Sequence, residues 1–261
     1  MQIQHSPWKH CNYEPSRLCH HNDYLLRWHM KKIIGILGGM GPAATVDAME
    51  KIIKHTPATC DQEHIPVIAV SFPEIPDRTA NIISDGASPL NKMLVALRKL
   101  ESAGAQCIIM PCNTAHYWYN ELKAATKINF MNMIDITCNK IVNERINNVA
   151  ILATTATIKS ELYQSRLEKE NINCVILDDI QQRCVMESIL AYKGGNAGKA
   201  YFLLKGVISQ LQSFGVEKFV MGCTEIPLIL SRDGNVDRYI DATEELIKSA
   251  VDWCYSDEIC F

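Results

Sequence analysis

The sequence lacks any apolar run close to the roughly 20 residues that a membrane-spanning helix needs. It also lacks a strong excess of charge, because 26 Lys and Arg residues nearly balance 29 Asp and Glu residues, for a formal net charge of −3. Such a balance provides no basic surface for nucleic acid or anionic lipid. The beginning of the chain has no apolar stretch of the signal-peptide type. We therefore expect a cytoplasmic protein with neither nucleic-acid nor membrane partners.

The sequence also lacks a disulfide framework, since its eleven cysteines are scattered without a recognisable spacing. In the cytoplasm thiols stay reduced, so we expect free cysteines.

The first 31 residues are polar, without apolar periodicity, and we predict that residues 1–31 form a disordered extension. A zinc site there is the alternative, although the spacing of its candidate ligands fits no compact zinc finger. These ligands are Cys11, Cys19, His20 and His21. We predict no metal.

From Lys32 onward, short continuous apolar runs alternate with amphipathic segments. This alternation predicts an α/β protein whose parallel sheets are covered by helices on both faces. The predicted strands are 33–37, 66–72, 106–110, 129–134, 148–153, 173–177 and 217–221. The predicted helices are 42–55, 88–103, 115–125, 136–145, 159–170, 180–192, 196–214 and 241–254. Ligands of such sheets bind beyond the carboxyl ends of the strands.

Two pairs of segments repeat at nearly the same offset, which indicates two similar half-domains. "GAQCIIMPCNT" (104–114) matches "GVEKFVMGCTE" (215–225), and "IIGILGGMGPAAT" (33–45) matches "NVAILATTATIKS" (148–160). We expect the halves to be related by a pseudo-twofold axis with the active site between them. The predicted boundaries place 32–134 plus 235–261 in the first half and 135–234 in the second.

Cys112 and Cys223 differ from the other cysteines because each directly follows a predicted strand and precedes a predicted helix. Amide groups at a helix N-terminus favour a thiolate, so both positions suit a reactive thiol. The remaining thiols of the folded part have no such setting. We expect the thiols within predicted strands and helices to be packing residues. These are Cys107, Cys138, Cys174 and Cys184.

Two thiols on opposite sides of a cleft suit the inversion of a stereocentre next to a carboxylate. One thiolate removes the α-proton while the other thiol supplies a proton to the opposite face. No pyridoxal cofactor is needed if oriented donors stabilise the carbanion-like transition state. Candidate donors are the side chains of Asn113, Thr114 and Thr224 and the amides of the turn at 38–41, which precedes a predicted helix.

Five motifs together resemble the aspartate racemases of the aspartate/glutamate racemase family, over roughly residues 32–250. They are "GILGGMGPAAT" (35–45), "PDRTA" (76–80), "PCNTAH" (111–116), "YKGGN" (192–196) and "GCTEIPL" (222–228). The forms "GGMGP" and "GCTE" favour aspartate racemases over glutamate racemases. The resemblance implies a cofactor-independent two-base racemase of a small amino acid, active as a homodimer.

The resemblance also implies roles for individual residues. Cys112 and Cys223 match the catalytic pair, and Met40, Arg78 and Lys193 match residues around the substrate. Arginine suits bidentate binding of a carboxylate. The other predicted substrate contacts are Asn113, Thr114 and Thr224. Supporting roles are predicted for Asp77, Thr154, Thr155 and Glu225, of which Thr154 and Thr155 follow from the symmetry of the two halves.

Three alternatives remain open. Another isomerase or decarboxylase of a carboxylic acid would share the fold and the cysteine loops. A non-enzymatic thiol or metal-binding protein would use the extension. A nicotinamide enzyme would use "GMGPAA" (39–44), with Asp61 or Glu63 as the ribose-binding acid, although neither ends the second strand.

His116 is a candidate base for Cys112, but its spacing favours a packing or capping role inside the next helix.

Overall fold

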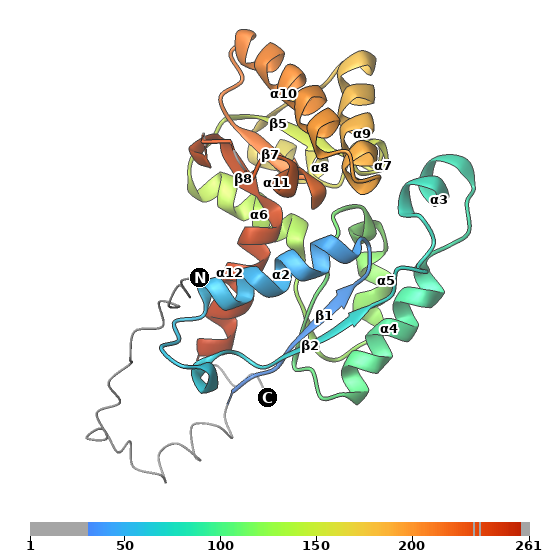
Figure 1. Cartoon of the computed structure of the whole chain (residues 1–261), viewed down its shortest axis with the longest axis vertical. Helices are drawn as coiled ribbons and strands as arrows, with labels where there is room; N and C mark the ends of the chain where they lie inside the picture. Colours follow the sequence, from blue (N-terminus) through green and yellow to red (C-terminus); the bar gives the residue numbers. More distant parts are fainter. Residues whose placement is uncertain (1–30, 232, 235, 257–261) are drawn as a thin grey trace, which may run out of the picture. The chain divides into compact units, whose positions relative to one another are not determined.

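The computed structural model describes residues 31–231, 233–234 and 236–256. The predicted extension and its candidate zinc ligands therefore lie outside the described residues, apart from Lys31. Two four-stranded parallel sheets form the framework (Figure 1). The predicted fold class, two α/β units with parallel sheets flanked by helices, is confirmed.

Each sheet has the same strand order when its strands are numbered within their own half. The first sheet has the order β2-β1-β3-β4, and the second has the order β6-β5-β7-β8. The first sheet contains β1 (Ile34–Gly38), β2 (Val67–Ser71), β3 (Cys107–Ile109) and β4 (Asn129–Phe130). The second contains β5 (Asn148–Ala153), β6 (Asn173–Val175), β7 (Phe219–Gly222) and β8 (Tyr239–Asp241). This equivalence agrees with the sequence repeat, and we call the two sheets with their helices the first and second halves.

Helices connect the strands in both halves. Those before β5 are α2 (Pro42–His55), α3 (Arg78–Ser84), α4 (Leu90–Ser102), α5 (Tyr119–Ala124) and α6 (Met133–Asn143). The later ones are α7 (Thr155–Lys159), α8 (Gln164–Leu167), α9 (Asp179–Lys193), α10 (Ala197–Ser213), α11 (Glu225–Ile229) and α12 (Ala242–Tyr255). The part of the chain that the structure describes also contains four 3-10 helices: η1 (Asp61–Glu63), η2 (Thr114–Trp118), η3 (Glu168–Glu170) and η4 (Val236–Arg238). Among the described residues, no helix is long and apolar enough to cross a bilayer.

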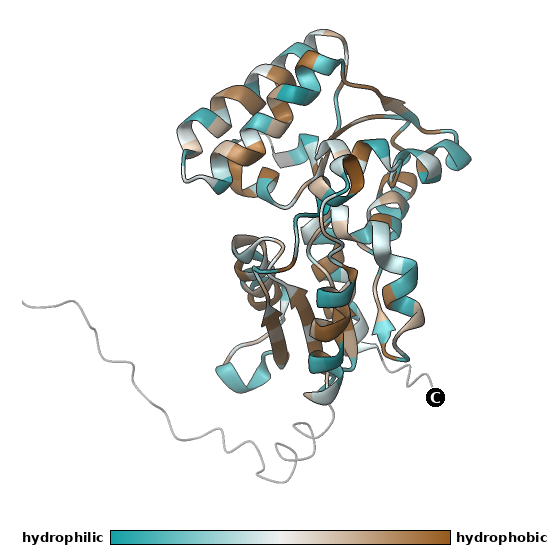
Figure 2. Cartoon of the chain, turned by 90° about the vertical axis from the view of Figure 1, so that its right-hand side faces the viewer, coloured by the Kyte–Doolittle hydropathy of each residue, from teal (hydrophilic) through white to brown (hydrophobic). Residues whose placement is uncertain are grey.

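The central strands β1 and β5 are buried on both faces, to which successive residues point in turn. In the first half, Ile36 packs with α2 and α12, whereas Leu37 packs with α4 and α5. In the second half, Leu152 packs with α9 and α10, whereas Ile151 packs with α6 and α8. Figure 2 shows the strands in brown and the helices with both brown and teal faces. Continuous apolar strands therefore arise from burial on two sides.

Local sequence signals set where several helices begin. Asn132 and Asp241 accept backbone amides of the first turns of α6 and α12 through their side chains. Asp178 and Gln181 form a complete capping box at the start of α9. Each cap satisfies amide groups that a helix leaves without an internal partner.

Several elements differ from the prediction, including α3 and β8, which were not predicted. The expected helix 159–170 is broken into α7, α8 and η3, with Glu161 at a φ of 51° between them. The C-terminal segment 235–261 was assigned to the first half, but its described residues 236–256 belong to both halves. Its strand β8 extends the second sheet, while Leu246 and Ala250 of α12 pack on the first. The cause is that β8 pairs with β7 through Ile240 before the chain enters α12.

Candidate active site

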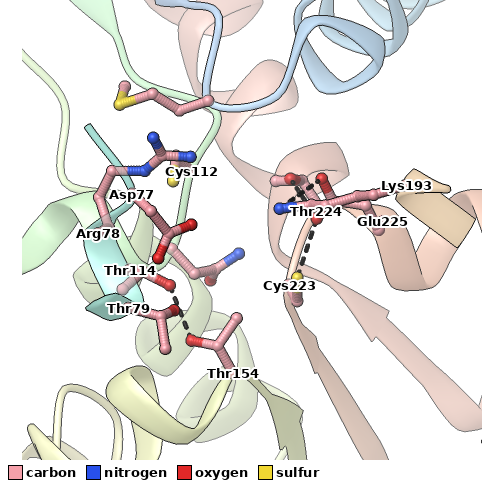
Figure 3. Close-up of a pocket in the computed structure, with 12 residues that line it drawn as sticks. Asp77, Arg78, Thr79, Cys112, Thr114, Thr154, Lys193, Cys223, Thr224 and Glu225 are labelled. Carbon is pink, nitrogen blue, oxygen red and sulfur yellow. Dashed lines mark hydrogen bonds and ion pairs between the residues drawn. The ribbon is translucent and has the colours of Figure 1, made fainter. Parts of the chain in front are cut away.

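The loops that follow β3 and β7 meet at one small cavity with an empty volume of about 310 Å³. Figure 3 shows Cys112 and Cys223 on opposite sides of this cavity. The lining residues come from both halves: Met40, Asp77, Arg78, Thr79, Cys112, Asn113, Thr114, Thr154, Lys193, Cys223, Thr224 and Glu225. This is the carboxyl edge of both sheets, where ligands of parallel sheets bind.

The glycine-rich loop after β1 forms one wall of the cavity, where its backbone lies close to the backbone of Phe72. Gly39 has a φ of 91°, and a Cβ atom at this position would lie 2.3 Å from the backbone nitrogen of Phe72. Its amide donates a hydrogen bond of 2.9 Å to Thr45 Oγ1 on α2. Only glycine fits these constraints. They place the next residue, Met40, in the cavity wall, with 3 % of its surface exposed.

His116 supports the Cys112 loop and does not act on the thiol. Its Nδ1 lies 2.8 Å from the carbonyl oxygen of Cys112, and its Nε2 accepts the amide of Met133 at 3.1 Å. An acceptor at Nε2 leaves the proton on Nδ1, so the ring is neutral and both nitrogens are used. Burial lowers the pKa of His116 to about 4. The structure thus agrees with the packing role expected for this histidine.

Acidification is expected to destabilise the protein through His116. The unfolded side chain, with a pKa of 6.5, takes up a proton as the pH falls, whereas the folded one resists until about pH 4. Between pH 7 and pH 5 the free energy of unfolding should therefore fall by about 2 kcal/mol from this residue. Urea denaturation of the native protein and of His116→Gln at both pH values measures this contribution. Equal pH dependence in the two proteins would contradict the assignment.

Cys223 lies in a polar contact that Cys112 does not have. Its thiol donates to Glu225 Oε2 at 3.0 Å, and Lys193 Nζ lies 3.4 Å from Glu225 Oε1 (Figure 3). Burial and the charge of Glu225 raise the pKa of Cys223 well above its ordinary value, although Lys193 opposes this effect. The expectation that a helix N-terminus lowers the pKa is wrong for this thiol. Helix α11 is short, and its first residue is itself a carboxylate.

Two basic residues reach the cavity from different halves. Arg78 begins α3, is buried, and donates from Nη1 to the carbonyl oxygens of Ile75 and Pro76, at 3.0 Å each. Lys193 ends α9, and its charge is shared with Glu225. Burial by itself would lower the pKa of Lys193, but Glu225 and the two cysteines outweigh it, so the pKa is raised. Both residues are therefore cations at neutral pH and can hold an anionic ligand.

Asp77 has a structural partner of its own. Its carboxylate accepts the amide of Ala80 at 2.7 Å and so caps α3, the helix that carries Arg78 and Thr79. A supporting role beside Arg78 was expected for Asp77. The contact supplies a physical basis, since the cap sets where α3 begins and hence where Arg78 enters the cavity.

The side chain of Asn113 is oriented from the other half by Tyr163, a residue that the sequence analysis missed. The fully buried Tyr163 hydroxyl donates to Asn113 Oδ1, which leaves Nδ2 as the free end of the amide. Within the described part of the chain, Nδ2 has no hydrogen-bond acceptor. A buried donor without a partner is costly, and this one belongs to a cavity-lining residue. It is therefore the donor in the wall most available to a bound carboxylate.

Three threonine hydroxyls form a closed triangle that joins the halves. Thr114 Oγ1 lies 2.8 Å from Thr154 Oγ1 and 3.0 Å from Thr157 Oγ1, and the latter two are also 3.0 Å apart. Each hydroxyl has one proton, so a closed triangle uses all three. Thr114 and Thr154 line the cavity as expected, but as a joint between halves rather than as free donors. Thr157 had no distinguishing sequence signal.

The remaining predicted residues divide between the cavity and its surroundings. Thr224 lines the cavity with its hydroxyl 3.5 Å from Glu225 Oε2. Thr155 is not among the lining residues, because its hydroxyl faces α9 and accepts from Gln182 at 3.4 Å. The two acids of the nicotinamide alternative, Asp61 and Glu63, lie in η1 before β2. That is the end of the strand opposite to the cavity, so neither can serve as the ribose-binding acid.

Two parallel α/β halves thus each bring one buried cysteine loop to a shared cavity. The chain belongs to the Asp/Glu/Hydantoin racemase family, whose model matches residues 37–250. It is thus an enzyme of the racemase class.

Individual relatives agree with this assignment. An aspartate racemase from Picrophilus torridus is similar in structure, with a TM-score of 0.79 and 38 % identity over 85 % of this chain and 94 % of that chain. The broad specificity amino-acid racemase RacX from Bacillus subtilis is 29 % identical over 84 % of this chain and 96 % of its own length. A glutamate racemase from Francisella tularensis, solved in complex with D-glutamate, shares the fold at a TM-score of 0.65 and 19 % identity, covering 87 % of this chain and 81 % of that chain.

Proposed function

We propose that the protein interconverts L- and D-aspartate without a cofactor, with Cys112 and Cys223 as the two bases. The observation that carries this proposal is one small cavity lined by a buried cysteine from each half, each only 6 % exposed. In each direction, one thiolate takes the α-proton to form S–H. The opposite thiol gives its proton to the other face of the same carbon.

The cavity offers two cations that can pair with the two carboxylates of aspartate, beside the acidic side chains of Asp77 and Glu225. Arg78 and Lys193 are cations on different halves, and Asn113 offers the unpaired Nδ2 donor. When the α-proton leaves, negative charge spreads into the α-carboxylate, and fixed donors stabilise that charge most in a site with little water. The similarity to an aspartate racemase at 38 % identity supports aspartate as the substrate.

The test uses metal-free, pyridoxal-free protein with L-aspartate in heavy water. We expect loss of optical rotation together with deuterium at the α-carbon of the D-product, because the proton added comes from a thiol that exchanges with solvent. Rotation that stays constant at high enzyme concentration would overturn the proposal. The same assay with L-glutamate determines the breadth of the site, since a relative is named for broad specificity.

Two further expectations concern the whole protein rather than its cavity. A homodimer and a cytoplasmic location stay predictions. Light scattering of the purified full chain measures the first, and fractionation of its native cells measures the second.

A further inference from the structure

The two cysteines differ in the residue two positions further along the chain. We propose that Glu225 is a positioning residue that keeps Cys223 protonated in the free enzyme, so that Cys223 starts as proton donor and Cys112 as proton acceptor. This assignment of roles in turnover rests on the proposed function. The protonation states themselves can be measured without any substrate.

The contact between Cys223 and Glu225 requires a proton. The sulfur and Glu225 Oε2 are 3.0 Å apart, and both residues are nearly excluded from solvent, at 6 % and 4 % exposure. A thiol can donate in this position, whereas a thiolate would place two negative charges in contact in a medium that screens them weakly. The carboxylate therefore favours the S–H form of Cys223.

Lys193 forms an ion pair with the carboxylate of Glu225 and moderates its effect on Cys223. Its Nζ lies 3.4 Å from Glu225 Oε1, the oxygen that does not face the thiol. Across the cavity, Cys112 raises the pKa of Lys193 and Arg78 lowers it. The groups acting on Cys223 are thus Glu225, which opposes the thiolate, and Lys193, which favours it.

Cys112 lies in a different environment. Its backbone amide donates to the Met110 carbonyl at 2.7 Å, and its carbonyl oxygen lies 2.8 Å from Nδ1 of His116. Among the described residues, its sulfur makes no hydrogen bond to a carboxylate. When the repeated segments are matched at their cysteines, Thr114 takes the place of Glu225. The repeat is therefore symmetric in its thiols and asymmetric in charge.

The proton balance of the first turnover follows from this difference. Cys112 thiolate forms an S–H bond with the α-proton of the substrate, and the S–H bond of Cys223 breaks as its proton goes to the opposite face. The product leaves Cys223 as a thiolate beside Glu225 and Cys112 as a thiol. The starting state returns when Cys112 releases its proton to solvent and Cys223 takes one up from solvent. Lys193 is the cation that offsets the two adjacent negative charges during this interval.

Alkylation by iodoacetamide tests the proposal, because only the thiolate reacts quickly. The rate at each cysteine is followed by peptide-resolved mass spectrometry as a function of pH, in Cys112→Ala and in Cys223→Ala. We expect the midpoint for Cys223 to lie at least about one pH unit above that for Cys112. Glu225→Gln is then added to each of these variants. It should accelerate the alkylation of Cys223 at neutral pH by at least about tenfold and leave the alkylation rate of Cys112 unchanged.

The exposed Glu217 before β7 provides a matched control, since Glu217→Gln removes the same charge at the opposite end of the strand. This substitution should leave both midpoints where they are. Lys193→Met should raise the Cys223 midpoint with Glu225 intact, which keeps the test valid if Glu225→Gln does not fold. Equal midpoints for the two cysteines, or a folded Glu225→Gln variant with an unchanged Cys223 profile, would overturn the proposal. If the two midpoints differ as expected but the protein does not racemise aspartate, the proposed function is overturned and the effect of Glu225 on Cys223 stands.

Discussion

Replacing either Cys112 or Cys223 with alanine is expected to lower the rate of racemisation by roughly 10²–10⁴-fold, the usual contribution of one general acid or base. Each substitution removes the group on one face of the α-carbon, and within the cavity no other thiol replaces it. The thiol that remains can still remove and return a proton on its own face. Each variant should therefore exchange the α-hydrogen of one enantiomer with heavy water and retain its configuration, with opposite enantiomers for the two variants.

Cysteines outside the cavity provide the controls for this experiment. Cys60 is exposed, and Cys107 is buried in the first sheet, where burial raises its pKa to about 12. Neither thiol reaches the cavity, so Cys60→Ala and Cys107→Ala should keep the native rate per folded molecule. Racemisation at the native rate in Cys112→Ala or in Cys223→Ala would exclude the two-base mechanism.

A single methyl group at Gly39 is expected to cost about 3 kcal/mol or more of folding free energy. The backbone has a φ of 91°, and the added Cβ would lie 2.3 Å from the nitrogen and 2.4 Å from the carbonyl carbon of Phe72. Backbone atoms cannot move aside as a flexible side chain can, so β1 and the start of α2 must shift. Chemical denaturation of Gly39→Ala against the native protein measures the loss.

Two other glycines separate backbone strain from the steric clash. Gly104 and Gly215 have φ values of 92° and 85°, but a Cβ atom at either would have no neighbour within 4 Å. Alanine at these positions should cost only the strain of the positive φ, on the order of 1 kcal/mol. A loss in Gly39→Ala no larger than in these two controls would show that the approach to Phe72 does not constrain the loop.

The strands and the cysteine loops could be predicted from sequence because their signals are local and repeated. All seven predicted strands are present, since a strand buried on both faces has a continuous apolar run. Strand β8 has only three residues and lacks such a run, so it was not recognised. Helix α3 was missed because its seven residues are too short for a clear periodicity, although Asp77 followed by a helical turn was a capping signal.

Side-chain contacts between distant residues could not be predicted in this way. Tyr163 and Asn113 are separated by 50 positions, and Thr114 and Thr157 by 43. Nothing in the sequence around Tyr163 or Thr157 distinguishes these residues from ordinary packing residues. The motif around Glu225 identified it as a neighbour of the site, but the direction in which it shifts the pKa of Cys223 depends on a contact geometry that only the structure supplies.

The path of the chain between the halves has a consequence for how substrate enters. The backbone crosses from one half to the other twice, between β4 and α6 and again between β8 and α12. Because the halves are joined at two points, the simplest relative motion is a hinge rotation of one half about the line through these two points. Such a rotation would break the threonine triangle and the Tyr163–Asn113 hydrogen bond, which join the halves beside the cavity. Opening the cavity by this rotation would therefore disturb the hydroxyl groups that hold the Cys112 loop in place.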